Sequence, residues 1–270
     1  MHRIFGMLAE EEEPLEKTEV KEVDTMKGDV KFEHVQFGYD EDLLMKNVNI
    51  DVKAGQMVAI VGPTGAGKTT LMNLLLRFYD VKGGSIKIDG VDIRDFKRED
   101  LRSLFSLVLQ DTWLFHGTIY DNIRYGRLSA RKDEVIEAAK MANVHHFIRT
   151  LSHGYDTELN EEANNISQGE KQLLTIARAI LKDPQILILD EATSSVDTRL
   201  EKMLQSAMQR VMKNRTSFVI AHRLSTIKNA DLILVLQHGD IVEQGTHESL
   251  LEKQGIYEKL YHSQFAQQEE

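Results

Sequence analysis

The stretch that decides the fold spans residues 62 to 70 and reads Gly62-Pro63-Thr64-Gly65-Ala66-Gly67-Lys68-Thr69-Thr70. It matches the phosphate-binding pattern G-x-x-x-x-G-K-[ST] at every specified position. A short apolar run precedes it and a mostly apolar, helix-like run follows it, so strand, loop and helix come in the required order. The glycines let backbone N–H groups face phosphate oxygens at the positive end of the following helix. The stretch therefore predicts a nucleotide site, with Lys68 on the β- and γ-phosphates and Thr69 as a Mg²⁺ ligand.

The composition narrows the class of protein. The 270 residues are enough for one large domain, with or without an inserted subdomain. A formal net charge of −10, with no stretch dense in Lys and Arg, argues against nucleic acid as a partner. Cysteine is absent, which excludes disulfides and thiolate chemistry within this sequence. No apolar run approaches the roughly 20 residues that cross a bilayer.

The first 28 residues are predicted to precede the folded domain. Residues 1–8 resemble the last turns of an amphipathic helix, and the run from Glu10 to Glu13 follows them almost directly. The sequence stays acidic and poor in apolar residues up to Gly28, as in solvated linkers. We therefore expect the folded domain to begin near Asp29.

Alternating apolar residues predict strands at 30–37, 48–52 and 86–88, which together indicate an antiparallel sheet around the loop. Tyr39 lies in the connection after the first of these strands. Its ring could stack on an adenine or pack at the edge of the sheet.

Residues 112–163 show helical periodicity, clearest at 133–141, and no convincing strand. This pattern predicts an inserted helical subdomain. His145 and His146 lie in it without Cys, Asp or Glu at metal-ligand spacing, so we interpret them as solvated or packing residues.

Polar residues follow two short apolar runs that are typical of buried strands. Residues 186–189 lead into Asp190 and Glu191, and residues 217–220 lead into Ala221 and His222. In parallel sheets the carboxyl ends of strands share one edge, where ligands bind. Asp190 can hold Mg²⁺ through water, Glu191 can polarise the attacking water, and His222 can contact the γ-phosphate. A hairpin is predicted around His238-Gly239-Asp240.

These elements, in this order, resemble the ATP-binding domain of an ABC transporter of the exporter type, from Asp29 to Phe265. The resemblance implies roles for further residues: Gln110 as the Q-loop glutamine that also contacts Mg²⁺, residues 186–190 as Walker B, and Asp197 in the D-loop. It makes Glu191 the catalytic carboxylate, His222 the switch histidine and Tyr39 the residue that stacks on adenine.

Pattern and resemblance together predict an α/β fold: a P-loop NTPase core with a mostly parallel sheet, an N-terminal antiparallel β subdomain and an inserted α-helical subdomain. The nucleotide-binding domain would span residues 29–270, with the helical insertion at about residues 112–172.

The family signature, normally Leu-Ser-Gly-Gly-Gln, here reads Ile166-Ser167-Gln168-Gly169-Glu170 and departs at three of five positions. Ser167 and Glu170 also have the spacing of a capping box before a helix. In the family this segment acts in trans, on the γ-phosphate held by the partner domain. Gln168 adds bulk and Glu170 adds negative charge where phosphate should approach, so we expect a weakened signature.

Residues 157–163 occupy the place of the exporter X-loop, and Asn160 and Ala163 replace its two glycines. Signature and X-loop thus deviate together while the Walker residues and the switch histidine are intact. This combination favours one half of a heterodimeric exporter, of the multidrug type, over a homodimer that tolerates a variant signature.

The functional hypothesis is MgATP hydrolysis at a two-chain interface, driving export by a transmembrane domain of the same polypeptide that this sequence does not contain. The domain would lie at the cytoplasmic face of the membrane. The exported substrate stays open between lipid, peptide and drug.

A soluble ABC-superfamily ATPase acting on nucleic acid or ribosomes is the alternative, but Lys68 and Asp190 are only about 120 residues apart, which leaves no room for coiled-coil arms. A P-loop kinase or GTPase would lack the glutamine, the signature and the histidine.

Overall fold

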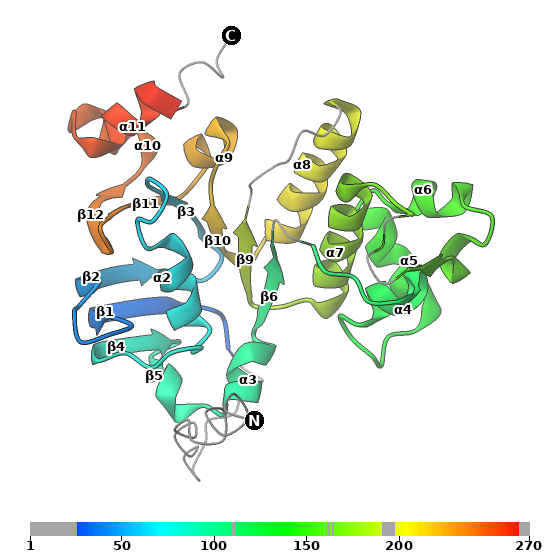
Figure 1. The fold of residues 1–270 in the computed structure, drawn as a ribbon, viewed down its shortest axis with the longest axis horizontal. Coiled ribbons are helices and arrows are strands. Elements are labelled where there is room, and N and C mark those ends of the chain that lie inside the picture. Colours follow the sequence, from blue (N-terminus) through cyan, green and yellow to red (C-terminus); the bar gives the residue numbers. More distant parts are fainter. Residues whose placement is uncertain (1–25, 110–111, 161–162, 164, 191–197, 265–270) are drawn as a thin grey trace, which may run out of the picture.

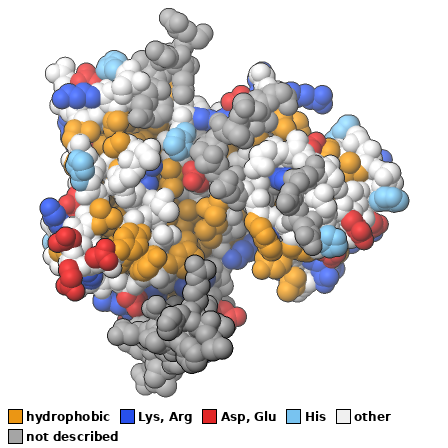
Figure 2. Space-filling view, in the orientation of Figure 1, with side chains coloured by type: hydrophobic (Ala, Val, Ile, Leu, Met, Phe, Trp, Pro, Cys, Tyr) orange, Lys and Arg blue, Asp and Glu red, His pale blue; other side chains and the backbone are white. Residues whose placement is uncertain are grey.

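A computed structural model describes residues 26–109, 112–160, 163, 165–190 and 198–264 of the chain. Two sheets form the body of the molecule, and a group of helices lies to one side of it (Figure 1). The space-filling view shows this group as a lobe that projects from the body (Figure 2). The part of the chain that is described holds no helix long and apolar enough to cross a membrane.

The first sheet is antiparallel and has the strand order β2-β1-β4-β5. Its strands are β1 (Val30–Phe37), β2 (Met45–Val52), β4 (Gly83–Ile88) and β5 (Val91–Asp92). The predicted strands are confirmed, and the imperfect alternation in β1 has a structural cause. The pairing with β2 shifts register between Phe32 and Val35, and His34 adopts a φ of 50°. This bulge brings Val35 and Phe37 to the buried face that Val30 and Phe32 occupy.

The second sheet has the order β12-β11-β3-β10-β9-β6 and is parallel except for β12. Its strands are β3 (Met57–Val61), β6 (Phe105–Val108), β9 (Ile186–Asp190), β10 (Thr216–Ile220), β11 (Leu232–Gln237) and β12 (Asp240–Gly245). The four residues 186–189 of β9 are fully buried, as a parallel strand covered on both faces requires. The predicted hairpin is confirmed as the antiparallel pair β11–β12.

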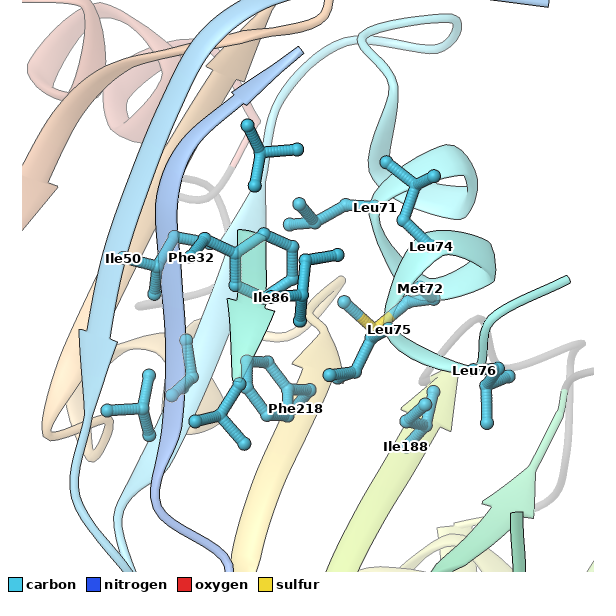
Figure 3. Packing of buried hydrophobic residues seen from close by; sticks show 14 of the residues in the cluster. Phe32, Ile50, Leu71, Met72, Leu74, Leu75, Leu76, Ile86, Ile188 and Phe218 are labelled. Carbon is cyan, nitrogen blue, oxygen red and sulfur yellow. The ribbon is translucent and has the colours of Figure 1, made fainter. Parts of the chain in front are cut away.

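Helix α2 (Lys68–Leu75) lies between the two sheets. Its buried residues Leu71, Leu74 and Leu75 share one hydrophobic cluster with Phe32 and Ile86 of the antiparallel sheet and with Phe218 of the parallel sheet (Figure 3). Each fully buried leucine contributes about 1.5–3 kcal/mol of hydrophobic stabilisation. The helix that follows the phosphate loop is therefore fixed from both sides.

The lobe contains α4 (Ile119–Arg124), α5 (Lys132–Met141), α6 (His145–Thr150) and α7 (Gln168–Lys182). Helix α8 (Thr198–Met212) packs against α7 and joins a second hydrophobic cluster with it. The lobe also contains a two-stranded ladder of β7 (Gly117–Thr118) and β8 (Glu158–Leu159), where the sequence indicated no strand. Strands of two residues are too short to show a period of two, so the pattern could not reveal them.

The other α-helices within the described residues are α3 (Arg98–Ser103), α9 (Leu224–Lys228), α10 (His247–Glu252) and α11 (Ile256–Gln264). His145 Nδ1 lies 2.8 Å from the Tyr155 hydroxyl, which gives this predicted packing histidine a partner within the lobe.

The predicted helix end and most of the acidic linker, residues 1–25, lie outside the described residues. Met26, the first described residue, already packs against the core, and the backbone N–H groups of residues 27–29 donate to the Asp89 carboxylate over 2.7–3.0 Å. Thr216 Oγ1 donates to the Gly28 carbonyl at 2.7 Å. The domain boundaries at residue 29 and at residues 112–172 stay predictions.

Candidate nucleotide-binding site

The loop from Gly62 to Gly67 connects β3 to α2 and depends on glycine at its two ends. Gly62 has a φ of 151° and Gly67 a φ of 103°, which side chains rarely tolerate. A Cβ on Gly62 would collide with the carbonyl oxygen of Leu236 in β11, and one on Gly67 would lie 3.1 Å from the Cα of Gly239. Glycine is therefore required at both ends of the loop, because the loop backbone lies so close to the β11–β12 hairpin.

Replacement of Gly62 by alanine is expected to lower the free energy of unfolding by about 3 kcal/mol or more, because the added methyl group meets a backbone carbonyl. Gly55→Ala is the matched control: Gly55 also has a positive φ, of 82°, but a Cβ there meets nothing within 4 Å. Gly55→Ala should lower the free energy of unfolding by only about 1 kcal/mol. Urea unfolding of both variants measures the difference, and equal losses would contradict the argument.

Lys68 begins α2 and folds its side chain back across the loop. Its Nζ donates to the carbonyl oxygens of Gly62 at 2.7 Å and Pro63 at 3.0 Å. Burial lowers the pKa of Lys68 below its usual value, and the nearby Asp190 carboxylate partly offsets this effect. The loop thus holds a partly desolvated ammonium group next to the N–H groups of a helix N-terminus, an arrangement suited to phosphate.

The neighbouring strands β9, β10 and β3 end at the same edge of the parallel sheet, and the loop begins at this edge. Asp190 is the last residue of β9 and pairs with Ile220 of β10, which in turn pairs with Ile60 of β3. The Ala221 N–H donates to the Ile60 carbonyl at 3.2 Å, so the exposed His222 follows directly beside the loop. The structure therefore brings Asp190, at the end of β9, and His222, just after β10, to the edge where β3 leads into the loop and Lys68.

The residues at this edge also fit a magnesium ion. The Thr69 hydroxyl is exposed in the first turn of α2, and the half-buried Asp190 carboxylate ends β9. Hydroxyl and carboxylate oxygens are hard ligands of the kind Mg²⁺ takes together with waters and substrate phosphates. Gln110, Glu191 and Asp197 lie outside the described residues, so their predicted roles stay predictions.

Tyr39 lies against the buried Thr70 of α2, with its hydroxyl 3.0 Å from Thr70 Oγ1. Its ring packs edge-on between Phe37, at 5.0 Å, and Tyr79, at 5.1 Å, and is 52% exposed. The structure thus places a half-exposed aromatic ring beside the loop helix. The ring packs at the edge of the sheet and still leaves about half of the residue exposed, so the two interpretations of Tyr39 do not exclude each other.

The signature segment forms the N-terminus of α7. Ser167 is the N-cap, and the predicted capping box is confirmed: Glu170 Oε2 accepts from both the backbone N–H and the hydroxyl of Ser167, each at 2.8 Å. Gln168 Nε2 donates to Thr112 Oγ1 at 3.1 Å, and Gly169 is buried. The Glu170 carboxylate therefore serves the N-cap of its own helix.

One contact that shapes the site has no signal in the sequence. The Gly239 N–H, at the tip of the β11–β12 hairpin, donates to the Ala66 carbonyl at 2.9 Å. The turn residues predict the hairpin itself. They carry no local pattern that shows its contact with Ala66, which lies some 170 residues earlier in the chain.

The parallel sheet, the glycine loop and the clamped lysine together define a P-loop nucleotide-binding protein. Residues 45–194 match the family model described as ABC transporter. The chain is 53% identical over 259 residues to the fatty acid ABC transporter ATP-binding/permease protein of Mycobacterium tuberculosis, covering 96% of this chain and 41% of that protein. It is 48% identical over 263 residues to the ATP-dependent lipid A-core flippase of Syntrophus aciditrophicus, covering 97% of this chain and 44% of that protein.

Among solved structures, a bacterial Atm1-family ABC exporter with ATP bound superposes with a TM-score of 0.88 at 43% identity, covering 97% of this chain and 46% of that one. The chain belongs to the ABC transporter family, whose ATP-binding domains hydrolyse ATP to drive transport. The predicted mostly parallel α/β fold and the exporter resemblance are confirmed. The chain spans less than half the length of these relatives.

Proposed function

We propose that this chain binds MgATP at the loop 62–70 and hydrolyses it at an interface with a second ATP-binding domain, to drive export through a membrane. The observation that carries the proposal is Lys68, which is clamped over the loop at the N-terminus of α2 and lies within the electrostatic reach of Asp190. The relatives named as ATP-binding/permease proteins support a transmembrane domain in the same polypeptide. The chain would then act at the cytoplasmic face of that membrane.

Each residue of the proposed site has a distinct task. The loop N–H groups and Lys68 bind the phosphates, and the ring of Tyr39 stacks on the adenine. Thr69, Asp190 and Gln110 hold Mg²⁺, which neutralises phosphate charge when bound. Glu191 accepts a proton from the attacking water, and His222 contacts the γ-phosphate.

A surface patch in the helical lobe supports docking of a transmembrane domain. Trp113, Tyr125 and Leu128 are 63%, 56% and 68% exposed, and Phe115 links the two aromatic rings at centroid distances of 6.0 and 5.6 Å. Figure 2 shows hydrophobic side chains gathered along the lower edge of this lobe. Such a cluster is typical of an interaction site. Trp113 follows the predicted Q-loop residue Gln110 by three positions in the sequence, so a bound nucleotide could influence the patch.

We further propose that the partner domain belongs to a different chain. The support is the deviating signature together with the deviating X-loop, beside an intact phosphate loop. Purification of the complete transporter through a tag on this chain should recover a second, non-identical ATP-binding chain. Recovery of this chain alone would overturn the heterodimer and leave a homodimeric exporter.

Glu170 offers a direct test of the weakened signature. Its carboxylate lies at the N-terminus of α7 beside the Ser167 hydroxyl, where the partner's γ-phosphate would approach. Glu170→Gln keeps the side-chain shape and an acceptor for the N-cap but removes the charge, so the complete transporter should hydrolyse ATP about fivefold faster at limiting ATP. Glu252→Gln, at the exposed end of α10, is the matched control. A rate unchanged or lowered by Glu170→Gln would contradict the proposed repulsion.

The general test of the proposed function is the rate of ATP hydrolysis by the complete transporter, reconstituted in lipid vesicles, with and without Mg²⁺. We expect Mg²⁺-dependent hydrolysis that lipids, peptides or drugs stimulate according to which of them is exported. Hydrolysis that needs a nucleic acid or a ribosome, and no membrane part, would instead support the soluble ATPase.

A further inference from the structure

A cavity of about 390 Å³ lies between α8 and α9, away from the phosphate loop. Its floor is formed by side chains of β3, β10 and α8, and its rim by residues of α8, of α9 and of the segments that directly follow these two helices. Cavities of this volume are in the range that binds small molecules. Among the described residues to which the proposed function assigns a task, none lines it.

The floor of this α8–α9 cavity is apolar and rich in methionine. Met57, Met208, Met212 and Val219 line it, with Val219 1% and Met208 7% exposed. Methionine side chains adapt to the shape of a ligand, and their sulfur atoms make favourable contacts with aromatic rings. This floor is therefore suited to a flat aromatic body.

The rim carries polar groups and a single charge. Gln205, Ser225 and Asn229 provide amide and hydroxyl groups. Among the described residues that line the cavity, Lys213 is the one cation and none carries a carboxylate. In a chain with a formal net charge of −10, a cavity with one cation and no acid favours a ligand with one negative charge.

We propose that the α8–α9 cavity binds a planar aromatic monoanion, with its ring among the methionines and its anionic group at Lys213. Aromatic carboxylates are the simplest members of this class. A neutral aromatic molecule of the same shape should bind more weakly because it cannot pair with the lysine.

The two helices that border the cavity connect it to the proposed catalytic segments. Helix α8 is the next described element after Asp190, and α9 begins two residues after His222. Two contacts join the helices: Gln205 Nε2 donates to Ser225 Oγ at 3.3 Å, and Arg223 pairs with Glu201 at 3.2 Å. A ligand bound between α8 and α9 would disturb these two contacts. Because α8 and α9 follow Asp190 and His222 in the chain, we expect the ligand to slow ATP hydrolysis. This second step rests on the proposed function, whereas binding itself does not.

Isothermal titration of the 270-residue chain with 2-naphthoate tests the site, with saturating ADP present so that the nucleotide site cannot take the probe. We expect one equivalent of 2-naphthoate to bind, and the uncharged 2-naphthalenemethanol to bind about threefold more weakly, the scale of an exposed ion pair. Lys213→Gln should remove this difference. Lys202→Gln, on α8 but outside the cavity, should preserve it.

Met212→Trp places a large ring in the cavity and should weaken binding of 2-naphthoate about tenfold or more. Circular dichroism checks that this variant is folded, and Lys213→Gln gives an independent answer if it is not. The proposed site would be overturned if 2-naphthoate did not bind or if ADP abolished its binding. It would also be overturned if neither Lys213→Gln nor Met212→Trp changed the binding.

The coupling is measured separately, as the ATPase rate of the complete transporter with and without 2-naphthoate. We expect about a twofold or greater decrease that Met212→Trp abolishes. Binding without any change in rate would overturn the coupling alone, and a transporter without ATPase activity would overturn the proposed function while leaving the binding result valid.

Discussion

Lys68→Ala is expected to reduce the affinity for MgATP about 100-fold, since charge-assisted hydrogen bonds to phosphate are each worth about 1.5–3 kcal/mol. In the structure Lys68 Nζ is held by two loop carbonyls, at 2.7 and 3.0 Å, and burial already lowers its pKa. A phosphate that replaces these carbonyls meets a cation that has lost much of its hydration. The interaction is stronger than at an exposed lysine because less water has to be displaced.

Fluorescent ATP binding to the purified chain measures this loss, with Lys97→Ala as the control. Lys97 is exposed at the N-cap of α3 and should leave the affinity unchanged within about twofold. Equal affinities for Lys68→Ala and the unaltered chain would remove the central support for the proposed nucleotide site.

Much of the fold could be predicted because its signals are local. The loop 62–70 is a contiguous motif, and the buried run 186–189 reads as apolar because both faces of its sheet are covered. The N-cap of α7 follows from Ser167 and Glu170, three residues apart. In each of these cases the residues that make the structure are neighbours in the sequence.

Features that depend on distant partners could not be predicted. The bulge at His34 shows only as a broken alternation, and the β7–β8 ladder joins residues about 40 positions apart through two pairs. The same holds for Gly239, whose N–H supports the loop at Ala66. The motif thus predicted which residues form the loop, and only the structure shows what keeps it in shape.

The capping box changes the meaning of the deviating signature. From the sequence, Glu170 was expected to act as a negative charge facing a phosphate. In the structure its carboxylate accepts from the backbone and the hydroxyl of Ser167, so the charge stabilises the helix N-terminus of its own chain. An approaching γ-phosphate would have to compete with Glu170 for the same serine, which is a more specific reason for a weakened signature than charge alone.

Glu191→Gln is expected to reduce ATP hydrolysis about 10²- to 10⁴-fold, the usual contribution of a general base. The residue directly follows Asp190, which ends the buried strand β9 at the edge that the loop and His222 share. Glutamine keeps the size and hydrogen-bonding shape of the side chain but cannot accept the proton of the attacking water. The affinity for MgATP should stay within about twofold of the unaltered chain, because the phosphate contacts of Lys68 are untouched.

Two matched variants separate this role from the other carboxylates. Glu252→Gln, exposed at the end of α10, should change neither hydrolysis nor binding. Asp190→Asn should weaken both, since it removes a proposed Mg²⁺ ligand and the charge that raises the pKa of Lys68. Single-turnover hydrolysis and ATP affinity, measured on the complete transporter, distinguish the three patterns. If Glu191→Gln hydrolyses ATP at a near-normal rate, the base must be sought elsewhere, and His222, which follows the neighbouring strand β10, is the next residue to replace.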